Sequence, residues 1–215
     1  MKHRYVLLLV LLILFCRPVF ADDAPINVEL DTSEVPHLAQ WGEEAKALIV
    51  RWHPRINNLL AIKDYKPPRQ IALKIRKSDN GIGATSGTTI TISSGWIEKH
   101  PEDSGLVVHE LVHVIQSYPN GDPWWVTEGI ADYLRWGIYE GKEQSWFPRP
   151  KEMRGYEKGY QVAAGFLLWL ESDLAPGIVK KLNTAMRNGK YSDDLFMTET
   201  GKSLDDLWNE YVSLE

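Results

Sequence analysis

The segment spanning residues 106–136 constrains this chain more than any other. It contains the pentad HELVH (residues 109–113) inside an otherwise apolar run, and the apolar residues on both sides predict a buried helix. On a helix, His109 and His113 lie one turn apart on the same face, so both imidazoles can reach one metal ion. Glu110 stands beside them, free to transfer a proton.

These three polar side chains need a physical reason to occupy so apolar a helix. An unpaired imidazole or carboxylate costs free energy when it is buried, and a zinc ion would provide the missing partner. The pentad alone is also compatible with histidines that only form hydrogen bonds in a protein core. A second motif is needed to choose between these interpretations.

The second motif follows a loop rich in turn-forming residues. Asp122 would cap a new helix whose first residue is Pro123, with Gly137 just beyond its end. On this helix Glu128 and Asp132 are four residues apart and share a face. A short loop makes the two helices neighbours, so this face can turn toward the histidines.

A catalytic zinc ion usually takes three protein ligands and keeps one position open for water. Glu128 would be the third ligand, and Asp132 would accept the second ring N–H of a ligating histidine. The two acids could also exchange these roles, or both could belong to an ordinary solvated helix face. Because the helix around them is largely apolar or aromatic, the two acids favour a metal site.

Three segments resemble the basic secretory protein family, a family of plant and bacterial peptidases placed among the zincins with a glutamate as third ligand. They are HELVHVIQ, WVTEGIADYLRW and GYQVAAGFL, and the likeness extends from about residue 40 to the C-terminus. The resemblance implies that His109, His113 and Glu128 bind one Zn²⁺ ion and that Glu110 is the catalytic acid and base. It also implies an α+β, zincin-like metallopeptidase domain. Such a domain has a small mixed β-sheet with an edge strand over the cleft, the HExxH helix and a mostly helical C-terminal half.

Periodicity and turn signals predict further elements along the chain. Helices are expected at residues 38–52, 156–170, 176–187 and 203–211, a strand at 70–76, and one or two strands at 84–94 with a hairpin at Gly87. Ser203 is expected to cap the last helix. His53 and His100, each before a proline, are expected in a helix end and a loop and not as metal ligands.

Two further groups of residues are candidates for contact with a substrate. By resemblance, the strand that would pair with an extended peptide lies in residues 84–90 and includes Thr88, Thr89 and Ile90, although a plain sheet strand is an equal alternative. Tyr160 and Tyr156 could stabilise a developing oxyanion. Burial in the core is the commoner role of such tyrosines.

Residues 1–21 have the features of a secretory signal peptide. A basic start precedes an apolar run, and the segment ends at a small-x-small site at Ala21. Cys16, the single cysteine, lies inside this segment; a lipoprotein anchor is the alternative, but Phe15 fits a lipobox poorly. The expected mature chain, residues 22–215, is one zincin-like domain without disulfides. The protein would be secreted or periplasmic.

Charge restricts the partners of this mature chain. Removing residues 1–21 takes away Lys2, Arg4 and Arg17 and no acid, so the formal net charge falls from −5 to −8. An acidic surface does not suit nucleic acid, and it departs from the "basic" of the family name, which describes plant members. We expect a peptide or protein substrate, a monomer, and no stable membrane association after signal cleavage.

Together these patterns predict a secreted zinc-dependent metallopeptidase, an endopeptidase, that hydrolyses peptide bonds with a zinc-activated water and Glu110 as general base. The alternative is a secreted binding or defence protein that keeps the zincin fold, holds a structural zinc and turns over little or no substrate.

Overall fold

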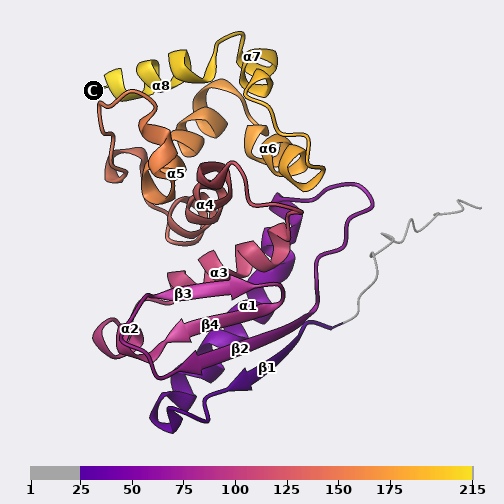
Figure 1. Cartoon of the computed structure of the whole chain (residues 1–215), viewed down its shortest axis with the longest axis vertical. Coiled ribbons are helices and arrows are strands. Elements are labelled where there is room, and N and C mark those ends of the chain that lie inside the picture. The colour runs from indigo at the N-terminus through magenta and orange to yellow at the C-terminus, as the bar shows by residue number, and fades with distance from the viewer. Residues whose placement is uncertain (1–24, 215) are drawn as a thin grey trace, which may run out of the picture.

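The computed structural model describes residues 25–214 and has a mixed α+β architecture (Figure 1). The sheet lies on one side of helix α3 (Gly105–Gln116), and helices α4 to α8 gather on the other side. The expected signal peptide and Cys16 lie outside the described residues. Between residues 25 and 214, no helix combines the length and the apolar character needed to cross a membrane.

The sheet is small and mixed, as predicted. Its strands are β1 (Asn27–Asp31), β2 (Gln70–Arg76), β3 (Gly83–Ser86) and β4 (Thr89–Ser93), in the spatial order β1-β2-β4-β3. The pairs β1–β2 and β2–β4 are parallel, whereas β3 and β4 form an antiparallel hairpin around Gly87. In β2 every second side chain is buried, which is the pattern of a sheet with one covered face.

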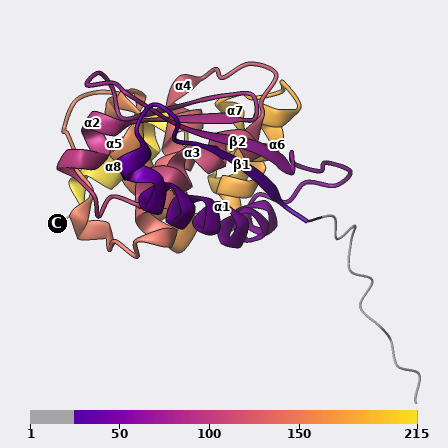
Figure 2. The same ribbon diagram turned by 90° about the horizontal axis from the view of Figure 1, so that it is seen from below.

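Helix α1 (Ala39–Leu59) lies beneath the sheet in Figure 2 and packs against α3. It is longer than the predicted helix, because it continues through Pro54. The proline removes the hydrogen bond to the carbonyl of Val50, but Val50 is 42% exposed, so water can satisfy that carbonyl. The expectation that His53 ends the helix is therefore wrong: His53 is buried inside α1, and its Nε2 lies 2.7 Å from the Pro68 carbonyl.

The remaining chain is mostly helical. Its elements are α2 (Ser94–Lys99), α4 (Trp124–Asp132), the π-helical η2 (Tyr133–Tyr139), α5 (Tyr160–Trp169), η5 (Leu170–Leu174), α6 (Ile178–Arg187), α7 (Asp194–Thr200) and α8 (Leu204–Ser213). Short 3₁₀ turns are η1 (Pro36–Leu38), η3 (Gln144–Trp146) and η4 (Gly155–Lys158). Ser203 caps α8 as predicted, accepting a hydrogen bond from the Asp206 N–H at 3.1 Å.

Both predicted ends of the second motif helix are wrong. Helix α4 begins at Trp124, one residue later than expected, and Asp122 gives it no side-chain cap. Helical structure continues past Gly137 to Tyr139 as η2. Tertiary contacts hold this last turn, because the Tyr139 hydroxyl lies 2.7 Å from Ser104 Oγ and its ring packs edge-on against Trp52.

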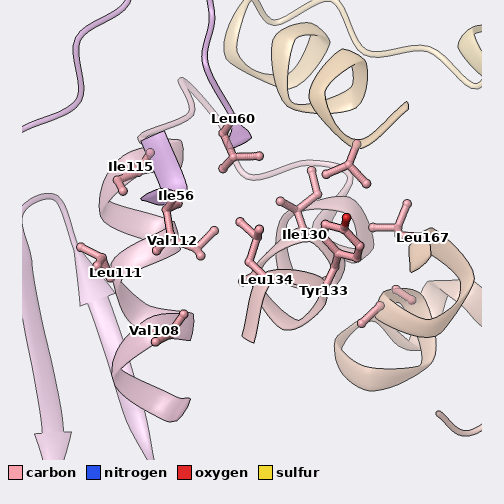
Figure 3. Close-up of a cluster of buried hydrophobic side chains, with 14 of the residues drawn as sticks. Ile56, Leu60, Val108, Leu111, Val112, Ile115, Ile130, Tyr133, Leu134 and Leu167 are labelled. Carbon is pink, nitrogen blue, oxygen red and sulfur yellow. The ribbon is translucent and has the colours of Figure 1, made fainter. Parts of the chain in front are cut away.

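Apolar packing fixes the orientation of α3. In Figure 3, side chains of α3 lie among those of α1, α4 and η2, the helices that pack against it. The residues of this hydrophobic cluster that the figure labels are all buried: Ile56, Leu60, Val108, Leu111, Val112, Ile115, Ile130, Tyr133, Leu134 and Leu167. Burying one such side chain contributes about 1.5–3 kcal/mol, so the polar face of α3 can point in only one direction.

Candidate metal centre and cleft

The polar face of α3 carries His109 and His113, and α4 presents Glu128 to both. His109 Nε2 lies 3.1 Å from His113 Nε2, and Glu128 Oε2 lies 3.3 and 3.5 Å from these two nitrogens. Among the described residues, these three side chains form a group whose ligand atoms could hold one metal ion. The structure thus brings together the three ligands expected from the sequence.

The charges at this group also fit a cation. Burial alone would lower the pKa of His109, but the hydrogen bonds that it donates to Asp132 and Glu128 outweigh burial and raise this pKa to about 9. Burial likewise opposes ionisation of Glu128, yet His109 and His113 lower the pKa of its carboxyl group to about 2. Positive charge is favoured beside these carboxylates, and a divalent cation can replace the protons.

Asp132 and Gln116 hold the two imidazoles in place. His109 Nδ1 lies 2.7 Å from Asp132 Oδ1, and His113 Nδ1 lies 2.8 Å from Gln116 Oε1. The Gln116 amide also donates to the Thr127 carbonyl of α4 at 2.9 Å, so it connects both helices of the site. Each Nδ1–H therefore has an acceptor, which leaves both Nε2 atoms free to bind a metal.

Glu110 lies beside this group and is held from the sheet. It is 6% exposed, and Thr85 of β3 donates a hydrogen bond to its Oε2 at 2.7 Å. Gly83 of the same strand allows this approach: a Cβ there would lie 2.9 Å from Glu110 Oε1. The hairpin therefore sets the position of the Glu110 carboxylate.

A cleft of about 530 Å³ opens in front of these residues, and His109, Glu110 and Tyr160 contribute to its lining. Tyr160, the first residue of α5, is 48% exposed, and its ring stacks on His109 with centroids 6.1 Å apart. Its backbone has φ of 44°, a conformation that is unfavourable for a tyrosine. Such strain is often found at functional sites.

The two candidate tyrosines have different environments. The helix predicted for residues 156–170 is interrupted at Gly159 (φ 64°), where a side chain would collide with Trp124. This break separates Tyr160, which faces the cleft, from Tyr156, which is 1% exposed and donates to Asp205 Oδ1 at 2.7 Å. Tyr156 is therefore a core residue, and its suggested role at the oxyanion is wrong.

The expected substrate strand also needs correction. Thr89 and Ile90 belong to β4, which is an interior strand because it pairs with both β2 and β3, and Thr88 lies in the turn before it. Their backbones cannot form the free edge of the sheet. The edge beside the cleft is β3, whose first residue Gly83 lines the cleft, and residues 84–86 of the expected stretch belong to this strand.

The sequence interpretation missed two polar residues of the site. Gln116 could have been found, because it lies three residues after His113 and so shares its helix face. Thr85 gave no such signal, since its contact with Glu110 depends on how the hairpin packs against α3.

Comparison with known protein families adds independent information. A family model described as "Peptidase of plants and bacteria", the BSP family, matches residues 34–211. The chain belongs to this family. The match includes all the site residues described above and confirms the resemblance seen in the sequence, so the BSP chain is a peptidase by family. No curated protein and no solved structure matches it.

Proposed function

We propose that this protein is a zinc-dependent metallopeptidase with a zincin-like fold. The main support is the spacing of the three atoms that would bind the metal, the Nε2 atoms of His109 and His113 and Oε2 of Glu128. Ligands about 2.0–2.1 Å from a tetrahedral zinc ion lie roughly 3.3 Å from one another, and the three separations here are 3.1, 3.3 and 3.5 Å. Two imidazoles and one carboxylate leave a fourth position open, which a purely structural zinc does not need.

The chemistry follows from the side chains around that position. A zinc ion bound by His109, His113 and Glu128 would lower the pKa of water and polarise a peptide carbonyl. Glu110 would accept the proton of the attacking water and pass it to the leaving nitrogen. Asp132 and Gln116 would keep both histidines in the required tautomer by accepting their Nδ1–H groups.

Tyr160 and β3 would complete the site. Burial and the carboxylates of Glu128, Asp132 and Glu110 raise the pKa of Tyr160, so its phenol remains a hydrogen-bond donor that could stabilise the oxyanion. Within the described chain β3 pairs only with β4, so its outer edge can bind an extended peptide backbone. A cleft that accepts an extended chain supports endopeptidase activity.

For the location and partners of the enzyme, our proposal rests on the sequence. The features of residues 1–21 support export to the periplasm or the medium. The acidic composition of the remaining chain supports a peptide or protein substrate and not nucleic acid. We expect the exported enzyme to be a monomer without stable membrane association.

The direct test combines metal analysis with peptide cleavage by purified wild type and by Glu110→Gln. Wild type should bind one zinc ion and lose activity on chelation, whereas the variant should keep the zinc and lose about 10²–10⁴-fold in kcat/KM. Glu157→Gln, at an exposed acid distant from the metal ligands in sequence, is the matched control. Cleavage by Glu110→Gln at the wild-type rate would refute Glu110 as the base. Zinc binding without any cleavage would favour the binding-protein alternative.

A further inference from the structure

A second hollow extends the cleft away from the metal ligands. Its volume is about 780 Å³, and it shares Ile82, Arg135, Trp136 and Gln161 with the cleft that contains Glu110. It lies between α2, the first turn of α3 and η2, and the rest of its wall comes from these elements, from the loop 100–104 that joins α2 to α3, and from Glu140 just after η2. A peptide bound across Glu110 can therefore extend a side chain into this hollow.

The wall of the hollow is aromatic. Trp96, Trp136 and Tyr139 line it, and Ile82, which is 41% exposed, stands where it joins the cleft. Aromatic faces attract cations and also pack against aliphatic stems. Arg135 already lies over the Trp136 ring at 4.0 Å, so the ring surface that remains suits a long side chain with a positive end.

The charged groups of the hollow have an excess of carboxylates, because Glu102, Asp103 and Glu140 are accompanied by one guanidinium, that of Arg135. The Asp103 carboxylate already has partners within the protein, because it accepts hydrogen bonds from Arg135 Nη2 at 2.6 Å and from Trp96 Nε1 at 2.9 Å. Its charge and that of Arg135 compensate each other locally. Glu140 has Arg135 and, from outside the lining, Lys142 nearby, but at longer distances, so Glu140 and the exposed Glu102 are the acids with the most capacity left for a ligand.

These two acids occupy different depths. The Glu140 side chain is 22% exposed, and its nearest cations are Arg135 Nε at 3.5 Å and Lys142 Nζ at 3.8 Å, both beyond the length of a strong hydrogen bond. Glu102 is 77% exposed, with His100 Nδ1 at 4.0 Å from its carboxylate. The hollow thus offers one recessed and one exposed carboxylate.

We propose that this hollow is a substrate subsite for a basic side chain, lysine or arginine. The aliphatic stem of that side chain packs on Trp96 and Trp136, and its charged end pairs with Glu140 inside the hollow and with Glu102 at its mouth. This assignment rests on the proposed function, because it treats the adjoining cleft as the site of peptide cleavage. It adds a substrate class, namely peptides with a basic residue near the scissile bond.

The test uses internally quenched peptides in which each position around the cleaved bond is in turn lysine, arginine, glutamine, leucine or glutamate. At one position, lysine or arginine should raise kcat/KM roughly fivefold over glutamine, as expected for a partly exposed ion pair. The preference should weaken as ionic strength rises, because salt screens such pairs. An unchanged rate, or a preference for glutamate at that position, would overturn the proposal.

Variants of the hollow test whether it causes the preference for basic peptides. Glu140→Gln should reduce it, and Glu102→Gln, at an exposed residue whose loss cannot disturb the core, should reduce it less. The readout is the ratio of kcat/KM for the lysine peptide to that for the glutamine peptide within each variant, so that any loss common to both peptides cancels. Glu157→Gln removes one charge outside the hollow and should leave the preference intact. If both hollow variants keep the full preference, the subsite lies elsewhere and the proposal fails.

A binding measurement separates this inference from the proposed function. Fluorescence anisotropy of the same peptides with zinc-loaded Glu110→Gln reports recognition without turnover. If wild type cleaves no peptide but lysine peptides still bind more tightly than glutamine peptides, the subsite stands and the peptidase assignment fails. If cleavage occurs without any basic preference in rate or binding, the peptidase stands and the subsite fails.

Discussion

The two ends of α3 are held in different ways. At its C-terminal end, Arg187 of α6 donates to the carbonyls of Ile115 and Ser117 at 2.6 and 3.1 Å, and the Tyr65 hydroxyl donates to the Ile115 carbonyl at 2.9 Å. The Arg187 guanidinium also lies over the Tyr65 ring. These contacts satisfy carbonyl groups that a helix end leaves without partners.

The N-terminal end of α3 meets the hollow instead. Asp103 accepts from the Leu106 N–H at 3.2 Å, and Glu140 reaches the helix start beside Gly105. These acids suit the positive end of the helix dipole, and Glu140 also lines the hollow, so its carboxylate has open space on one side. The comparison indicates that one end of the helix fixes the metal ligands, while the other end can adapt to a substrate.

The largest effect should come from Gln116, which connects the C-terminal end of α3 to α4. Gln116→Leu removes the acceptor of His113 Nδ1 and the donor to the Thr127 carbonyl. Zinc affinity should fall about 10–100-fold, measured by competition with a chromogenic chelator.

Gln116→Glu is the matched control for this prediction. It keeps an acceptor for His113 Nδ1 and loses only the donor to Thr127, so its zinc affinity should remain closer to wild type. If both variants lose affinity equally, the connection to α4 matters more than the tautomer of His113.

A smaller effect is expected at Arg187. Arg187→Ala leaves the Ile115 and Ser117 carbonyls with fewer partners and should lower the free energy of unfolding by about 2 kcal/mol. For a chain of this size that corresponds to a fall of about 4–8 °C in Tm, read from thermal denaturation followed by circular dichroism. Zinc affinity of the folded variant should change much less than in Gln116→Leu.

Two control variants help to interpret the Tm of Arg187→Ala. Arg187→Lys keeps the charge but lacks the planar group that reaches two carbonyls, so it should be intermediate. Arg154→Ala removes an exposed arginine paired with Glu157 and should change Tm little. An unchanged Tm in Arg187→Ala would show that the C-terminal end of α3 does not depend on this contact.

The part of the site that follows helix periodicity could be predicted from the sequence. His109 and His113 are four residues apart, as are Glu128 and Asp132, and that spacing alone places each pair on one face. The sequence predicts the strand at residues 70–76 and the hairpin at Gly87 just as directly, because apolar and polar residues alternate in the strand and a glycine marks the turn.

The rest depends on contacts between distant segments. The continuation of α4 as η2 depends on Tyr139 meeting Trp52 and Ser104, and the exposure of Tyr160 depends on the break at Gly159. Strand order is also tertiary information: nothing in Thr88 to Ile90 indicates that β4 lies between β2 and β3. The stretch expected from the sequence, residues 84–90, therefore includes part of the edge strand β3, but the residues singled out in it, Thr88, Thr89 and Ile90, lie in the turn and in β4.

The smallest effect should be at the N-terminal end of α3, with Gly105→Ala. An added Cβ would lie 2.2 Å from Glu140 Oε1 and 3.0 Å from Arg135 Nε. Because the Glu140 carboxylate ends a flexible side chain beside a hollow, it can move away, and alanine is a better helix former than glycine. Tm should therefore stay within about 3 °C of wild type, while the preference for basic peptides weakens as Glu140 is displaced.

Gly165→Ala provides the matched comparison for this prediction. A Cβ at Gly165 would lie 2.4 Å from Phe147 Cβ and 2.6 Å from the Tyr211 hydroxyl oxygen, in a fully packed core. Overpacking there should cost about 1–3 kcal/mol, with no room for relief. Equal losses of Tm in the two variants would show that the N-terminal end of α3 is as tightly packed as the core, and the contrast between the two helix ends would then be wrong.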